Sequence, residues 1–219
     1  MEDFTHIRRI AILVFPGADE MDFVGPLRVL RAAVASGKTS LTACDLVTYA
    51  PHSASDFITA SHGMQVKPDS LLDAHTFGAY DLLMVVGGGW ANRAPVGAYA
   101  EMQAGHVTKL LREVALANDK IIFASVCTGA LLLAHAGILG EGQHASTYHS
   151  ARMDLAAFGV HVVEDRVVVH QKEGGRIIVS SGGVTSGIDL ALCLVGKVAG
   201  DEVADSIARG MEYERVFRF

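Results

Sequence analysis

The chain has 219 residues, of which half are apolar and 19% are charged, and its formal net charge is −6. This composition excludes a disordered protein, because disordered chains are poor in apolar residues and rich in net charge. The acidic balance, with no basic cluster longer than Arg8-Arg9, argues against a nucleic-acid partner. The length suits one large α/β domain, and we expect a single domain over residues 1–219.

Strand-like apolar runs alternate with helical patterns along the whole chain. The pattern predicts strands at Ile10–Phe15, Cys44–Tyr49, Asp81–Val86, Ile121–Ser125 and Ile177–Ser180. It predicts helices at Gly25–Ser36, Tyr99–Asn118, Gly129–Ala136, Ser150–Phe158, Ser186–Ala199 and Asp201–Arg209. An extended segment or hairpin is expected at Phe57–Val66, and a second hairpin from Val160–Val163 and Val167–His170. Apolar strands separated by helices predict an α/β fold with a mainly parallel sheet covered on both faces.

The segment 121–140 is an uncharged run of 20 residues, which by length alone could cross a bilayer. It also contains Ser125, Cys127 and His135, and it begins with β-branched residues before it becomes rich in Ala and Leu. We therefore expect two buried elements joined by a turn and no membrane span. The N-terminus is polar and lacks the apolar stretch of a signal peptide, which favours a cytoplasmic protein.

Cysteine usage points to free thiols. The three cysteines are widely spaced and odd in number, so neither a disulfide framework nor a zinc site is expected. A free cysteine is often a small buried hydrophobe, and we expect this of Cys44 and Cys193. Cys127 differs, because it follows a strand directly in the pattern Ser-Val-Cys-Thr-Gly over residues 125–129. Small residues two before and two after a nucleophile permit the sharp turn of a nucleophile elbow, and a helix that begins there would lower the pKa of the thiol.

Two loops at the same edge of the sheet can supply the groups that a nucleophile needs, a proton-handling partner and donors for developing charge. The loop after the first strand contains Asp19, Glu20 and Asp22, and spacing alone does not choose among these acids. They could equally belong to a solvated loop or cap the next helix. The loop after the third strand contains the three glycines 87–89, which permit close backbone approach or a tight turn but lack a phosphate-binding spacing.

Five segments, in this order, resemble the ThiJ/PfpI family of the class I glutamine amidotransferase-like superfamily. They are IAILVFPGADEMDFVGP, YDLLMVVGGG, ASVCTGALLLAHAGIL, ASTYHSARMDLAAFGV and SSGGVTSGIDLAL. The resemblance runs from about Arg9 to the tail. It is closest to the isocyanide (isonitrile) hydratase branch, which shares the Cys-Thr-Gly elbow, a GGVT-GID segment and a Glu-Tyr pair near the C-terminus. It implies a flavodoxin-like α/β sandwich that forms a homodimer with the site near the interface.

Carried over by position, the resemblance implies that Cys127 is the nucleophile and that Asp22, which precedes the Gly-Pro of the first loop, is its partner acid rather than Asp19 or Glu20. The hydratase threonine that follows the nucleophile is Thr128. Oxyanion and substrate contacts fall on Gly88, whose N–H would face the nucleophile, and on Gly89, Trp90 and His149.

The chain departs from the hydratase pattern at two places. Hydratases tend to have Thr-His-Trp where this chain has Tyr148-His149-Ser150, and a smaller or phenylalanine-type residue is expected in place of Trp90. In peptidase-like relatives a histidine near His149 is invoked as the base, but those relatives also have histidine right after the nucleophile, where this chain has Thr128. Peptidase activity is therefore the weaker interpretation.

The activity that the resemblance implies is the hydration of an isocyanide to an N-substituted formamide through a thioimidate on Cys127. Asp22, with a pKa raised by burial and by the thiolate, would donate the proton, and Thr128 would orient water or Asp22. Two alternatives stay open: a non-catalytic or redox-sensing protein with an oxidisable thiol, and glyoxalase-like activity on 2-oxoaldehydes. We expect a small-molecule substrate, a homodimer, and no cofactor, metal, nucleic acid or membrane.

Overall fold

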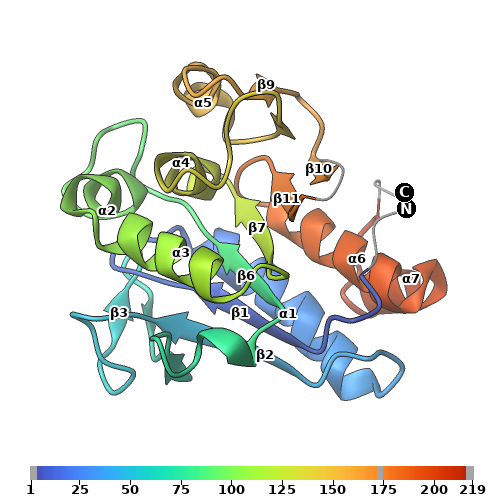
Figure 1. Ribbon diagram of the computed structural model, residues 1–219. Helices are drawn as coiled ribbons and strands as arrows, with labels where there is room; N and C mark the ends of the chain where they lie inside the picture. The colour runs from blue at the N-terminus through green and yellow to red at the C-terminus, as the bar shows by residue number, and fades with distance from the viewer. Residues whose placement is uncertain (1–3, 172–174, 216–219) are drawn as a thin grey trace.

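The computed structural model describes residues 4–171 and 175–215. Its centre is a seven-stranded sheet with the strand order β10-β11-β7-β6-β1-β2-β5 (Figure 1). All neighbouring strands pair in parallel except β10 and β11, so the predicted flavodoxin-like α/β fold is confirmed. The strands are β1 Arg9–Leu13, β2 Ala43–Thr48, β5 Ser70–Leu71, β6 Leu82–Val85, β7 Ile122–Val126, β10 Val167–Gln171 and β11 Ile177–Ser181.

Helices cover both faces of this sheet, which explains why β6 and β7 are buried along their whole length. On one face α1, α6 and α7 pack together, and on the other α2, α3 and α4 do so, with α5 beside α4 (Figure 1). The helices are α1 Glu20–Ser36, α2 Ala98–Ala104, α3 His106–Ala117, α4 Gly129–His135, α5 Arg152–Ala156, α6 Ser186–Ala199 and α7 Asp201–Gly210.

The uncharged run at 121–140 consists of β7 and α4, two short buried elements that meet at Cys127. The predicted division of this run is therefore confirmed. Within the part of the chain that the structure describes, no helix has the length and apolar character required to cross a membrane.

The first helix begins five residues earlier than predicted, at Glu20 instead of Gly25. The sequence pattern placed Pro26 in the first turn, but the N-cap is Asp19, whose Oδ1 accepts a hydrogen bond of 3.0 Å from the N–H of Met21. The earlier start places Asp22 in the first turn of α1, facing the sheet, instead of on a loop.

The predicted helix at Tyr99–Asn118 is two helices, because Gly105 adopts a φ of 76° between α2 and α3. Apolar spacing continued across this break, so periodicity did not reveal it. The helix expected at Ser150–Phe158 begins as a 3-10 turn, His149–Ala151, and continues as α5.

The two hairpin predictions differ in outcome. The segment 57–66 forms an antiparallel hairpin of β3 Ile58–Thr59 and β4 Gln65–Val66. The second hairpin is wrong: β9 His161–Val162 pairs in parallel with β8 His144–Ala145, and β10 pairs with β11. An isolated two-stranded hairpin is only marginally stable, whereas pairing with β11 makes β10 the edge strand of the central sheet. Residues 172–174 and the last four of the predicted C-terminal tail, 216–219, lie outside the described part of the chain.

Candidate active site

Cys127 occupies a strained turn between β7 and α4, at the carboxyl edge of the sheet. Its φ of 58° lies in the left-handed region, which is uncommon for a residue other than glycine. Two hydrogen bonds hold the turn: the Cys127 N–H donates to the carbonyl of Gly182 at 3.0 Å, and the Thr147 hydroxyl donates to the Cys127 carbonyl at 2.8 Å. A side chain at Gly129 would overlap the carbonyl of Val85, which explains the glycine two residues after Cys127. The geometry is that of the predicted nucleophile elbow.

Asp22 reaches the same edge from the first turn of α1 and is completely buried. Its Oδ2 accepts a hydrogen bond of 2.9 Å from the N–H of Gly87, and its Oδ1 accepts one of 3.1 Å from the N–H of Val184. Burial, followed by the charge of Asp19, raises the pKa of Asp22 from 3.8 to about 8, although these N–H donors and the Cys127 thiol act in the opposite direction. Asp22 is therefore predominantly protonated at neutral pH.

The pKa of the Cys127 thiol is raised, so the prediction that the start of a helix would lower it is wrong. The side chain is almost fully buried, at 5% exposure. Burial, and after it the charge of Asp22, raise the pKa of the thiol, and the N–H of Thr128 only partly offsets this effect. The repulsion by Asp22 disappears when its carboxyl is protonated. The titrations of the two side chains are therefore coupled, and protonation of Asp22 favours the thiolate of Cys127.

The glycine loop contacts both members of this pair, but with a different residue from the one predicted. The N–H of Gly87 binds Asp22, while the N–H of Gly88, expected to face the thiol, donates to the Thr128 hydroxyl at 3.0 Å. A Cβ at Gly87 would overlap the Thr128 hydroxyl and lie 3.1 Å from the Cβ of Cys127. The glycines therefore permit close approach of this loop to the elbow, where the Thr128 hydroxyl accepts the hydrogen bond of Gly88.

A cavity of about 200 Å³ opens over the thiol. Of the residues predicted for oxyanion and substrate contacts, Gly88, Gly89 and Trp90 line it, and His149 does not. His149 is exposed, and its ring packs against that of Tyr148, which takes its place on the cavity wall. The full lining is Asp19, Gly88, Gly89, Trp90, Ala91, Asn92, Cys127, Thr128, Tyr148 and Val184.

Two backbone contributors to the site were missed, Gly87 and Val184. Val184 has a φ of 57°, a strained conformation for a β-branched residue, and this conformation directs its N–H at Asp22. The Gly-Gly-Val-Thr segment was a signal for this loop, but a backbone donor leaves no side-chain signature in the sequence. Gly183 is also required, because a Cβ there would collide with the ring of Tyr148.

Among the described residues, one cluster could offer ligands to a metal ion: Asp19, Glu20 and His62, whose ligand atoms lie within 4.8 Å of one another. These atoms already have partners. Asp19 caps α1, and Glu20 Oε2 lies 2.7 Å from Nδ1 of the exposed His62. The cluster links the β3–β4 hairpin to the start of α1 through the hydrogen bonds of Glu20. Among the described residues, no further feature indicates a bound metal at this place.

Comparison with known proteins identifies the family. The DJ-1/PfpI family matches residues 8–197. The chain is 32% identical to the isonitrile hydratase of Pseudomonas putida over 94% of its length and 78% of that protein. It is 30% identical to protein DJ-1alpha of Drosophila melanogaster over 91% of its length and 82% of that protein. A crystal structure of a ThiJ/PfpI family protein from Pseudomonas syringae superposes with a TM-score of 0.73 at 26% identity, covering 100% of this chain and 78% of that one. This chain therefore belongs to the DJ-1/PfpI family.

Proposed function

We propose that the protein hydrates an isocyanide to an N-substituted formamide, with Cys127 as the nucleophile and Asp22 as the proton carrier. The observation that carries this proposal is a buried carboxyl, with a pKa raised to about 8, placed beside a thiol at the base of a small cavity. The terminal carbon of an isocyanide must receive both a nucleophile and a proton. A thiol next to a protonated carboxyl supplies both. Similarity to the isonitrile hydratase of Pseudomonas putida supports the choice of substrate class.

In the first step, the Cys127 sulfur forms a bond to the terminal carbon of R–N≡C, and that carbon receives the proton of the Asp22 carboxyl. The thiol proton passes to the carboxylate that has just formed, so Asp22 ends the step protonated. The product is a thioimidate, R–N=CH–S–Cys127. Backbone donors from Gly87 and Val184 hold the carboxyl in place through this exchange.

In the second step, water adds to the carbon of the C=N bond and one of its protons passes through Asp22 to the nitrogen. The C–S bond then breaks, and the remaining hydroxyl proton returns to sulfur. The products are R–NH–CHO and the free Cys127 thiol. Thr128 anchors the glycine loop beside Cys127 by accepting the hydrogen bond of Gly88.

One of the two alternatives, the redox sensor, fits the site less well. Oxidation of a sensor cysteine depends on thiolate character and exposure. Cys127 is 5% exposed, which is unfavourable for a sensor. Glyoxalase-like chemistry would use the same thiol and acid, and it is separated from hydration by comparing methylglyoxal with an isocyanide. The homodimer, the cytoplasmic location and the absence of a cofactor, metal, nucleic acid or membrane partner stay predictions.

The test replaces Cys127 and a matched cysteine. Cys127→Ala should abolish release of formamide from ethyl isocyanide, measured by chromatography. Cys44→Ala should retain it, because Cys44 is a buried residue of β2 outside the cavity lining. Formamide release by Cys127→Ala at the rate of the unmodified protein would refute the assignment, and turnover of methylglyoxal alone would favour the glyoxalase-like activity.

A further inference from the structure

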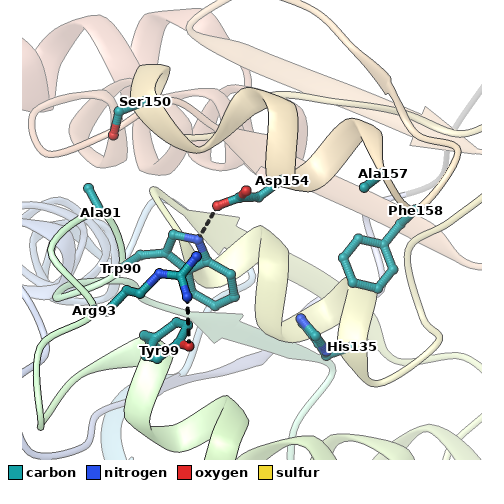
Figure 2. Close-up of a pocket in the computed structure, with 9 residues that line it drawn as sticks. All are labelled: Trp90, Ala91, Arg93, Tyr99, His135, Ser150, Asp154, Ala157 and Phe158. Carbon is teal, nitrogen blue, oxygen red and sulfur yellow. Dashed lines mark hydrogen bonds between the residues drawn. The ribbon is translucent and has the colours of Figure 1, made fainter.

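A second cavity adjoins the thiol cavity and shares two wall residues with it, Trp90 and Ala91. This second cavity, which we call the aromatic pocket, has a volume of about 450 Å³. Figure 2 shows the side chains around it, with the indole of Trp90 at its centre and the rings of Tyr99, His135 and Phe158 around it. Its lining consists of Trp90, Ala91, Arg93, Tyr99, His135, Ser150, Asp154, Ala157 and Phe158.

Trp90 is held in place from the side of the aromatic pocket. Its indole Nε1–H donates a hydrogen bond of 2.6 Å to Oδ2 of Asp154, on α5 (Figure 2). Its ring meets the edge of Tyr99 at a centroid distance of 5.6 Å and lies 6.0 Å from the ring of His135. Aromatic pairs at these distances are favourable, and the indole is 7% exposed. The residue that bounds the thiol cavity is therefore positioned by partners that do not line that cavity.

The size of the thiol cavity limits what can bind beside the sulfur. A protein cavity of about 150 Å³ accommodates one benzene ring, and the thiol cavity measures about 200 Å³. On the side of the cavity that Trp90 closes, the further space for a substituent larger than one ring is the aromatic pocket. The position of one side chain therefore decides whether the two volumes act as one.

We propose that Trp90 is the specificity-determining residue of the thiol cavity and that Asp154 is its positioning residue. Together they confine the site to substrates whose substituent is no larger than about one ring, and without them bulky aryl substituents extend into the aromatic pocket. Applied to substrates, this inference rests on the proposed hydration of isocyanides. Applied to access to the Cys127 thiol, it stands independently of the reaction.

The first experiment measures access without catalysis. Cys127 is alkylated with iodoacetamide or with N-(1-naphthyl)iodoacetamide, and the rate of each is measured by peptide mass spectrometry relative to glutathione. In the unmodified protein, the glutathione-normalised rate of alkylation by the naphthyl reagent should be at least about tenfold lower than that by iodoacetamide. Trp90→Ala should bring the two normalised rates close together. The same naphthyl-to-iodoacetamide ratio in both proteins would overturn the proposal.

The second experiment tests Asp154 with the indole still present. Asp154→Leu removes the hydrogen-bond acceptor, whereas Asp154→Asn keeps an acceptor oxygen. Asp154 is exposed, so neither change disturbs the core. If Trp90→Ala fails to fold, the size preference of Asp154→Leu tests whether the indole limits access to the thiol. Asp154→Leu should lower the size preference and Asp154→Asn should preserve it. The chain has one tryptophan, so a red shift of the fluorescence in Asp154→Leu alone should report release of the indole. Unchanged fluorescence and size preference in Asp154→Leu would refute the positioning role.

The third experiment compares turnover of ethyl isocyanide and 2-naphthyl isocyanide. Trp90→Ala should raise kcat/KM for the naphthyl substrate relative to the ethyl substrate by at least about tenfold. If neither isocyanide is turned over but alkylation shows the size preference, the proposed function fails and the size filter stands. If both are turned over with the same ratio by the unmodified protein and Trp90→Ala, the filter fails and the proposed function stands.

Discussion

Asp22 and Asp189 are buried to the same degree, at 0% and 1% exposure, but their partners differ. Asp189, on α6, accepts a hydrogen bond of 2.6 Å from the Arg166 guanidinium and one of 3.0 Å from the Tyr213 hydroxyl. Asp22 accepts hydrogen bonds from backbone N–H groups and lies beside a thiol. A buried carboxylate beside a cation has its charge compensated, whereas backbone dipoles alone do not compensate for the burial of Asp22.

The difference separates a structural acid from a chemical one. The Arg166–Asp189 pair joins the loop before β10 to α6, and Tyr213 adds the segment after α7 to the same group. This explains the Glu-Tyr pair near the C-terminus noted in the sequence: its tyrosine anchors the chain end to Asp189. Asp22 has no cation beside it and burial raises its pKa, and in the proposed reaction it is the residue that carries the proton.

Replacement of Asp22 should produce the largest effect on activity. Asp22→Asn keeps the shape of the side chain but can neither donate nor accept the transferred proton. Because general acid–base catalysis contributes about 10²–10⁴-fold, we expect kcat for isocyanide hydration to fall by that factor. Steady-state kinetics of the folded variant measure this loss. Alkylation of Cys127 in the same variant is the control that the thiol is still accessible. Activity close to that of the unmodified protein would assign the proton transfer to another group.

Replacement of Arg166 should instead affect stability. Arg166→Gln leaves the buried Asp189 carboxylate without its cation. Because the guanidinium is partly exposed to solvent, we expect the free energy of unfolding to fall by about 1–3 kcal/mol, the cost of an unsatisfied buried acceptor. Denaturant titration measures this loss, while turnover of the folded variant should fall far less than in Asp22→Asn. A small loss of stability with a large loss of turnover would reverse the roles given to the two aspartates.

The third prediction concerns the dependence of stability on pH. Because the pKa of Asp22 rises from 3.8 to about 8 on folding, the folded state binds more protons than the unfolded state between these pH values. The contribution of Asp22 to stability therefore falls as the pH rises through this range and levels off above about 8. Asp22→Asn should remove this contribution. Thermal denaturation across the range, compared between the two proteins, measures it, and parallel curves would contradict the raised pKa.

Local features of the sequence predicted the elements of the sheet and the elbow. β6 is a continuous apolar run and β7 departs from one only at Ser125, as is typical of strands buried on both faces. The glycine two residues after Cys127 is required by the approach of Val85. The start of α1 and the break at Gly105 were missed, because an N-cap and a left-handed glycine interrupt a helix without changing its apolar spacing. The partners of β9 and β10 were also missed: β9 pairs with the preceding strand β8, and β10 pairs with the following strand β11, so the two do not pair with each other.

The sequence by itself determined which residue types stand at the elbow and that the uncharged run at 121–140 turns at Cys127, because strand length, small residues and glycine are local requirements. Only the tertiary structure decided the chemistry. The pKa of Asp22 follows from burial and from N–H donors of two loops 65 and 162 residues away along the chain. The position of Trp90 likewise depends on a carboxyl 64 residues away. Desolvation and contacts between distant segments exist only in the folded chain, and these set the protonation of the site and the size of its cavity.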